Sequence, residues 1–105
     1  MSANTVGDLA SSVRSKNAGP FWLTIDLFFA EREQYEAVAQ ALAVATVAER
    51  MGADPAAVKR YALDDLLVLK FSLPRPSIQG TRADRDMHGA AYACLIAEIP
   101  LTLAA

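Results

Sequence analysis

Apolar and polar residues alternate in two segments of the chain, which is the pattern of β-strands with one face in a hydrophobic core. Residues 21–29 and 66–73 are rich in aromatic and aliphatic side chains. Because successive side chains in a strand point to opposite faces, each segment presents one continuous apolar face. These faces consist of Phe21, Leu23, Ile25, Leu27 and Phe29 in the first segment and of Leu67, Leu69, Phe71 and Leu73 in the second. Their apolar character predicts that both segments lie in the middle of a sheet.

A helical region is predicted between the two strands. Residues 31–51 contain neither glycine nor proline, and their apolar residues recur at helical spacing in two stripes. The stripes do not line up, so we expect either one helix or two short helices with a break near residues 42–45. Gly52 supplies a C-terminal stop. A second helix is predicted over residues 87–95, on whose apolar stripe the thiol of Cys94 should be buried and inert.

Two further strands are expected at the edges of the sheet. Residues 58–62 include Lys59 and Arg60, and residues 96–103 include Pro100, which cannot donate a hydrogen bond to a neighbouring strand. The order of elements is then strand, helix, strand, strand, helix, strand. This order predicts an α+β fold, a ferredoxin-like βαββαβ sandwich whose four-stranded antiparallel sheet carries both helices on one face.

Length and composition indicate a single domain. A chain of 105 residues can bury a hydrophobic core of its own, and we expect residues 1–6 to form a flexible tail. The net charge of −2 does not favour nucleic acid as a partner. No apolar run approaches the length of about 18 residues that a membrane span needs, and no secretory signal is recognisable. A single cysteine allows no internal disulfide, which predicts a cytoplasmic location.

Residues 14–20 concentrate polar groups in a predicted turn ahead of the first strand. If the two central strands pair antiparallel, this turn lies beside the end of the other central strand and the start of the second helix. Basic side chains and helix N–H groups together suit an anion such as a carboxylate, a phosphate or the phosphates of coenzyme A. The residues expected to bind it are Arg14, Ser15, Lys16, Asn17, Gly19, Arg75 and Gly89. A solvated turn without a ligand is the alternative.

Two titratable residues near the start of the second helix are candidates for proton transfer. His88 is the only histidine, and Asp86 lies two positions before it. Together with Asp84 they offer three metal ligands but no fourth partner, so no metal site is predicted. Structural roles remain the alternative for both residues, with Asp86 as a helix cap. The sequence contains no phosphate-binding loop and no dinucleotide fingerprint, and no cofactor is predicted.

The sheet face away from the helices is predicted to carry an apolar patch. It should consist of Trp22, Phe28, Leu66 and Val68. A lone domain seldom exposes such a patch, so we expect it to be buried in a homo-oligomer or against a larger partner protein. Coverage by a terminal segment of the chain is the alternative.

Several short motifs resemble a small family encoded beside acyclic terpene utilisation (AtuA-type) proteins. The motifs are Asp8-Leu9-Ala10, residues 14–20, Lys70-Phe71, Pro74-Arg75-Pro76 with Gly80, and Asp86-x-x-Gly89-Ala90. The layout is also similar to the C-terminal domain of AtuA proteins, which is assigned a ferredoxin-like fold. The resemblance implies a cytoplasmic partner of an AtuA-like large protein, in catabolism that involves acyl-CoA or organic acids. The chain departs from the family after Ala90, where a stretch bearing glutamine and histidine is replaced.

Two functions are therefore compatible with the sequence. The first is an accessory subunit of an AtuA-like catabolic protein, which docks through its open sheet face and contributes a basic rim for an acyl-CoA or carboxylate ligand. The second is a free-standing small lyase or hydratase acting on organic acids, with His88 or Asp86 as the proton carrier. No catalytic partner for His88 is visible in the sequence, which favours the accessory subunit.

Overall fold

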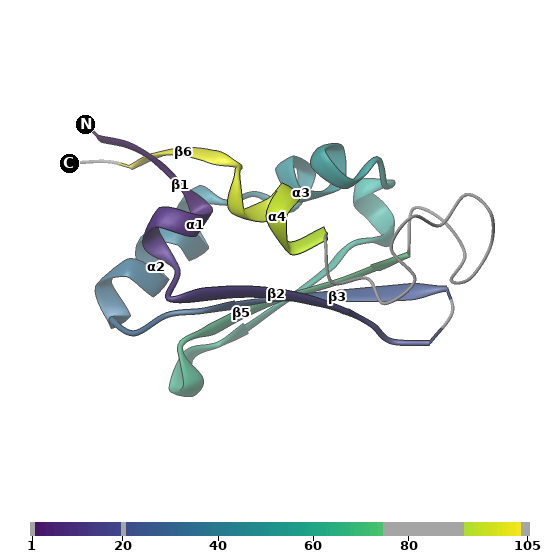
Figure 1. The fold of residues 1–105 in the computed structure, drawn as a ribbon, viewed down its shortest axis with the longest axis horizontal. Helices are drawn as coiled ribbons and strands as arrows, with labels where there is room; N and C mark the ends of the chain where they lie inside the picture. Colours follow the sequence, from purple (N-terminus) through teal and green to yellow (C-terminus); the bar gives the residue numbers. More distant parts are fainter. Residues whose placement is uncertain (1, 20, 75–91, 104–105) are drawn as a thin grey trace.

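The computed structural model describes residues 2–19, 21–74 and 92–103, and a four-stranded antiparallel sheet forms its centre (Figure 1). The strands follow the order β2 (Ser12–Asn17), β3 (Trp22–Phe28), β5 (Val68–Pro74) and β4 (Lys59–Leu63). Each neighbouring pair is antiparallel. The two apolar segments read from the sequence are the two central strands. The predicted α+β fold of ferredoxin-like type, with a four-stranded antiparallel sheet, is confirmed.

Helices cover one face of this sheet (Figure 1). They are α1 (Val6–Leu9), α2 (Arg32–Ala41), α3 (Val44–Met51) and α4 (Tyr92–Ala97), with a short 3-10 turn, η1 (Pro55–Ala57), after α3. The predicted break between two short helices is confirmed, because Leu42 and Ala43 are both extended. Gly52 ends α3 in the left-handed conformation, with φ 67°. None of the described helices has the length and apolarity that a membrane crossing requires.

The hydrophobic core lies between the sheet and the helices. The central strands contribute six side chains without exposed surface: Leu23, Ile25, Leu27, Leu69, Phe71 and Leu73. Tyr35, Val38 and Val47 pack against them from the helices. Burying one such side chain contributes about 1.5–3 kcal/mol, so the apolar alternation determines which face the helices cover. Phe21, predicted on the same face, precedes β3 and is 58% exposed.

One edge of the sheet differs from the prediction. The sequence predicts β6 (Pro100–Leu103) there, but β6 pairs with β1 (Ser2–Thr5) in a separate two-stranded sheet, and β2 takes the edge beside β3. A short turn joins β2 to β3, in which the amide of Ala18 donates to the carbonyl of Trp22 at 2.9 Å. Closing a short loop costs less entropy than closing a long one, which favours the neighbouring segment over a distant strand.

The N-terminal residues that the structure describes, expected to form a tail, are in regular structure. Ser2–Thr5 form β1, and Val6 has no exposed surface. A capping box begins α1: Thr5 Oγ1 accepts a hydrogen bond from the amide of Asp8 at 3.2 Å, and Asp8 Oδ2 accepts one from the amide of Thr5 at 3.0 Å. The hydrogen bond from the Thr5 amide, and next the interaction with the Thr5 side chain, hold the pKa of the Asp8 carboxyl below its usual value.

A second 3-10 turn, η2 (Asp64–Leu66), joins β4 to β5. Leu67 follows in the left-handed conformation, with φ 53°, and separates the turn from β5. Leu66, predicted as the first residue of the strand, therefore belongs to the turn and is 69% exposed. The hydroxyl of Tyr35 on α2 donates to Asp64 Oδ1 at 2.5 Å, which ties the turn to the helix layer.

Candidate functional site

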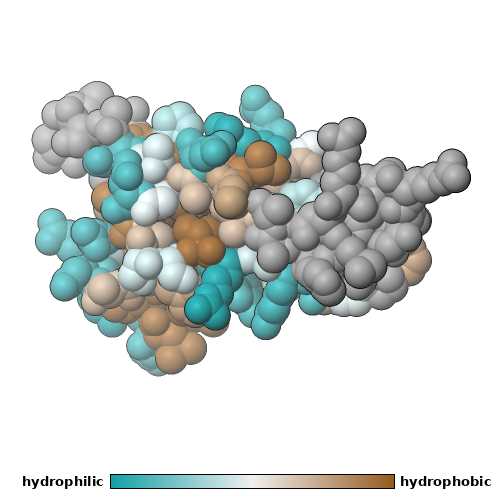
Figure 2. Space-filling model, viewed as in Figure 1, coloured by the Kyte–Doolittle hydropathy of each residue, from teal (hydrophilic) through white to brown (hydrophobic). Residues whose placement is uncertain are grey.

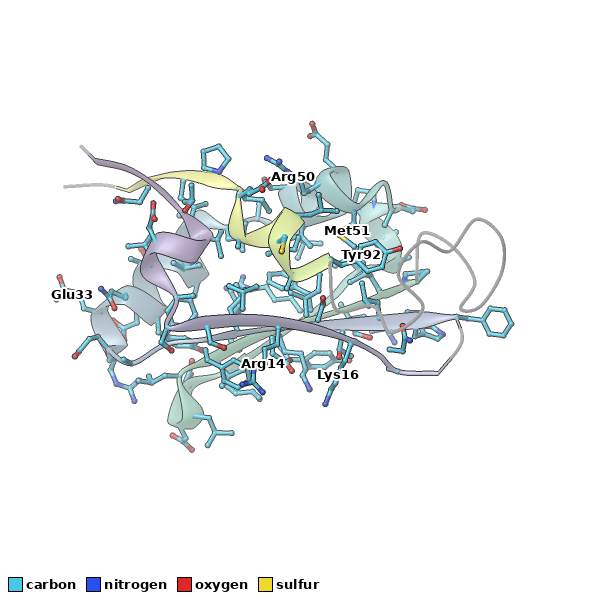
Figure 3. All side chains as sticks on the ribbon, in the orientation of Figure 1. Arg14, Lys16, Glu33, Arg50, Met51 and Tyr92 are labelled. Atoms are coloured by element: carbon cyan, nitrogen blue, oxygen red, sulfur yellow. The ribbon has the colours of Figure 1, made fainter. Side chains whose placement is uncertain are left out.

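Arg14 and Lys16 lie in a strand and not in the predicted turn. Both belong to β2, whose residues pair with β3 from Ser12 to Asn17. The strand signal in the sequence is weak here because Val13 is the only apolar residue of β2. Backbone pairing does not require any particular pattern of side chains. Arg14 and Lys16 both point away from the helices (Figure 3).

Ser15 points to the opposite side, into the helix layer. It is 7% exposed, and its Oγ accepts a hydrogen bond from the amide of Ala93 in α4 at 2.8 Å. The sheet therefore separates Ser15 from the side chains of Arg14 and Lys16, because adjacent residues of a strand face opposite sides. The predicted rim, with all three residues around one anion, does not form from these residues.

Asn17 and Gly19 shape the end of β2. Asn17 is its last residue and pairs with Leu23, and Gly19 follows with φ 90°. A residue with a Cβ seldom adopts that conformation, so the turn itself accounts for the glycine. Four other predicted site residues lie outside the described residues: Arg75, Asp86, His88 and Gly89.

The sheet face away from the helices, the open face, has two rows of polar residues across its middle. In the strand order β2, β3, β5 and β4, one row is Arg14, Asp26, Lys70 and Tyr61, and the next is Lys16, Thr24, Ser72 and Lys59. Residues paired directly across antiparallel strands share a face. Four cations and one carboxylate give the two rows a net charge of +3, whereas the whole chain has −2.

Asp26 is the carboxylate at the centre of the open face. It is 9% exposed, and Lys70 Nζ lies 3.5 Å from its Oδ1. At this distance the two groups form an ion pair but no hydrogen bond. Asp26 Oδ1 has no hydrogen-bond donor among the described residues. Lys70 therefore stabilises the buried carboxylate through its charge. Within the described part of the chain, the other cations of the open face have no carboxylate within ion-pairing distance.

Sequence reasoning did not include Asp26, Lys59 and Lys70 among the candidate site residues. The signal was present in the strands, where polar residues alternate with the core residues. Their convergence depends on the register between four strands, which pairs Arg14 with Asp26 and Asp26 with Lys70. A single strand cannot reveal that register.

Apolar side chains stand at the two ends of the open face. Trp22, at one end of β3, is 41% exposed; at the other end Val68 is buried and Leu63 is 39% exposed. The length of β3 separates Trp22 from Phe28 by about 20 Å, and Leu66 lies beyond the strand in η2. The prediction of one continuous patch formed by these side chains is therefore wrong, because the polar rows divide it.

The apolar end at η2 is also hollowed. A depression of about 390 Å³ is lined by residues 62–66, among them the exposed Leu63 and Leu66. Figure 2 shows hydrophobic surface at the lower left, where η2 projects in Figure 1. Asp64 and Asp65 line it as well, so this end offers a concave contact of mixed apolar and acidic character beside the charged rows.

Cys94 is exposed, contrary to the prediction of a buried thiol. Ile96 faces the core and has no exposed surface. Two residues turn a helix by about 200°, so Cys94 faces away from the core. It lines a shallow depression of about 240 Å³ beside α1 and the start of β2. Among the described residues, no group of three or more His, Cys, Asp or Glu side chains is arranged to hold a metal ion.

The sheet and its open face define a small α+β domain with a basic, partly apolar surface. Residues 6–99 match the family described as a domain of unknown function, DUF4387, and the chain belongs to that family. The match runs from the start of α1 to the residue before β6. No curated protein and no solved structure matches the chain.

Proposed function

We propose that the chain is a cytoplasmic accessory subunit of an AtuA-like catabolic protein. It docks through the open face, and Arg14 and Lys16 help to hold an acyl-CoA or carboxylate ligand in the complex. One observation supports this most strongly. The described helices cover one face of the sheet, while the other face presents Trp22 and Tyr61, 41% and 46% exposed, beside a set of cations. Tryptophan, tyrosine and arginine are the usual anchors of protein interfaces.

The apolar ends provide only part of the free energy of docking. Four side chains are substantially exposed there: Trp22, Tyr61, Leu63 and Leu66. Burying their exposed halves contributes about 3–6 kcal/mol. Association itself costs about 4–15 kcal/mol in lost freedom of motion. The charged rows between the two ends must therefore contribute to the same interface.

Arg14 and Lys16 are placed to share one anion. They stand two residues apart on one face of the edge strand β2, with about 7 Å between their Cα atoms. A guanidinium binds a carboxylate or phosphate through two parallel hydrogen bonds, which an ammonium cannot do. The ligand would lie between the open face and the docked partner, while Ser15, Asn17 and Gly19 shape the strand and turn that hold the two cations.

Copurification with an AtuA-like protein tests the docking. We expect the parent chain to form a stable complex and Trp22→Ala to weaken it at least tenfold, because an anchor side chain is lost. Leu95→Ala is the matched control, since Leu95 is 39% exposed on α4, on the helix side of the sheet. Docking is refuted if the parent does not bind, or if the two variants bind equally well.

Calorimetry on the complex, with coenzyme A thioesters and small dicarboxylates, tests the ligand site. Arg14→Lys should weaken binding although the net charge is kept, because the paired hydrogen bonds are lost. Arg50→Lys on α3, which lies on the opposite side of the molecule (Figure 3), should have no effect. If Arg14→Lys and Arg14→Ala both bind the ligand like the parent, the cations do not form the site.

A free-standing lyase or hydratase is the alternative. It would use His88 or Asp86, which lie outside the described residues. Turnover of an organic acid by the purified chain, abolished by His88→Ala or Asp86→Asn, would favour this activity over the accessory role.

A further inference from the structure

The cations of the open face require opposite charges once a partner covers them. Arg14, Lys16 and Lys59 have no carboxylate within ion-pairing distance in the described part of the chain. Burying an unpaired cation is strongly unfavourable. We infer that the occupant of the open face is a different protein with an acidic surface, whose carboxylates, together with the ligand held by Arg14 and Lys16, supply the charges opposite these three cations. The inference rests on the proposed function, since it concerns the same face.

The positions of the cations call for a broad acidic surface. Lys16 and Lys59 stand at the two ends of one row, on the two edge strands. Three spacings between strands separate them, about 14 Å. One small anion at Arg14 and Lys16 cannot also reach Lys59. The counter-charges must therefore be spread over the partner, on more than one of its side chains.

A second copy of the chain would present the wrong charge. In a symmetric dimer the same surface of each subunit meets itself. The polar rows occupy the middle of the open face, so rows with a net charge of +3 would lie opposite rows with +3. Packed sheets are about 10 Å apart, which is about one Debye length at moderate salt. Repulsion across such an interface is therefore only partly screened, whereas an acidic partner makes the interaction attractive.

Nucleic acid fits this face less well than an acidic protein. Proteins that bind single strands on a sheet stack the bases on aromatic side chains set among cations. On the central strands the two rows present no aromatic residue: these positions are Asp26, Thr24, Lys70 and Ser72. The exposed aromatic residues lie apart from each other: Tyr61 is on the edge strand β4, and Trp22 lies beyond the rows, at the end of β3.

Charge reversal tests the inference on the complex. The double variant Lys16→Glu, Lys59→Glu should bind an AtuA-like partner at least 100-fold more weakly than the parent. The control is Arg50→Glu with Gln40→Glu and Thr46→Glu, which makes the same change in net charge at exposed positions of α3 and α2, and it should stay within about threefold. Parent binding should also weaken at least tenfold between low and moderate salt. Where the parent binds the AtuA-like protein, the inference is overturned if the double variant and the control bind alike, or if salt has no effect.

A second measurement does not depend on the AtuA-like protein. NMR titration of the isotope-labelled chain with poly-L-glutamate should shift amide signals of Arg14, Lys16 and Lys59, and titration with oligothymidylate should shift them less. A dimer formed through the open face would be strengthened in the Lys16→Glu, Lys59→Glu variant, because the substitutions remove repulsion between the two copies. Sedimentation should show no such dimer. Tighter binding of oligothymidylate, a dimer through the open face, or no response to poly-L-glutamate overturns the inference. If poly-L-glutamate binds the face and the AtuA-like protein does not, the proposed function fails while the inference on partner chemistry stands.

Discussion

Replacement of Tyr35 by phenylalanine tests how strongly the hydrogen bond between α2 and η2 stabilises the protein. Tyr35 is 2% exposed, and its hydroxyl donates to Asp64 Oδ1 at 2.5 Å. The bond joins α2 to η2, the turn that presents Leu66. Phenylalanine keeps the ring and its edge-on packing against Phe29, with 5.8 Å between the ring centroids. The variant therefore removes one hydrogen bond and little else.

The expected loss of stability follows from this geometry. A hydrogen bond to a charged group contributes about 1.5–3 kcal/mol. Asp64 is exposed and can return to water in the variant, so we expect a loss of about 1–2 kcal/mol. For a domain of this size that lowers Tm by about 4–16 °C. Urea unfolding at about pH 8 measures the loss. Tyr61→Phe, at a tyrosine 46% exposed on β4, is the matched control and should change stability by less than about 0.5 kcal/mol.

The hydrogen bond from Tyr35 to Asp64 also predicts that the free energy of unfolding depends on pH. Burial, and next the hydrogen bond to Asp64, raise the pKa of Tyr35 to about 12, whereas the pKa in the unfolded chain is about 10. The folded protein holds the proton more tightly, so the stabilisation is fully present below pH 10 and is lost as the pH rises from about 10 to about 12. The difference in stability between the parent and Tyr35→Phe should therefore become smaller over that range of pH. A variant as stable as the parent at about pH 8, or a deficit that stays constant to about pH 12, would refute the reasoning.

Three further substitutions test local features by urea unfolding. Thr5→Ala removes the side-chain acceptor of the capping box and should cost about 1 kcal/mol; an unchanged stability would contradict that role. Gly19→Ala places a Cβ at φ 90° and should cost about 1–2 kcal/mol, and a gain in stability would show that the turn relaxes freely. Asp26→Asn leaves Lys70 without its counter-charge. Because Lys70 is 35% exposed, we expect a loss of about 1–2 kcal/mol, and none for the control Asp65→Asn.

Local patterns in the sequence are sufficient to predict the central strands, the helix layer and the break between α2 and α3. Ile25 and Leu69 have no exposed surface, and Leu42 interrupts the helices where the two apolar stripes cease to align. These features depend on local hydrophobic periodicity, and burying the apolar side chains dominates the free energy of folding. The pattern therefore identifies elements whose stability comes from the core.

Long-range strand pairing, in contrast, determines which segments form the edges of the sheet and which polar residues lie together. β2 has a single apolar residue, and it holds its place by backbone hydrogen bonds that every sequence can make. The same backbone pairing joins β1 to β6 and leaves the edge beside β3 free for β2. The register of β2 then places Arg14 beside Asp26 on one face and Ser15 against α4 on the other. A shift of one residue would exchange these faces, so the chemistry of the open face is set by a pairing register that no local pattern encodes.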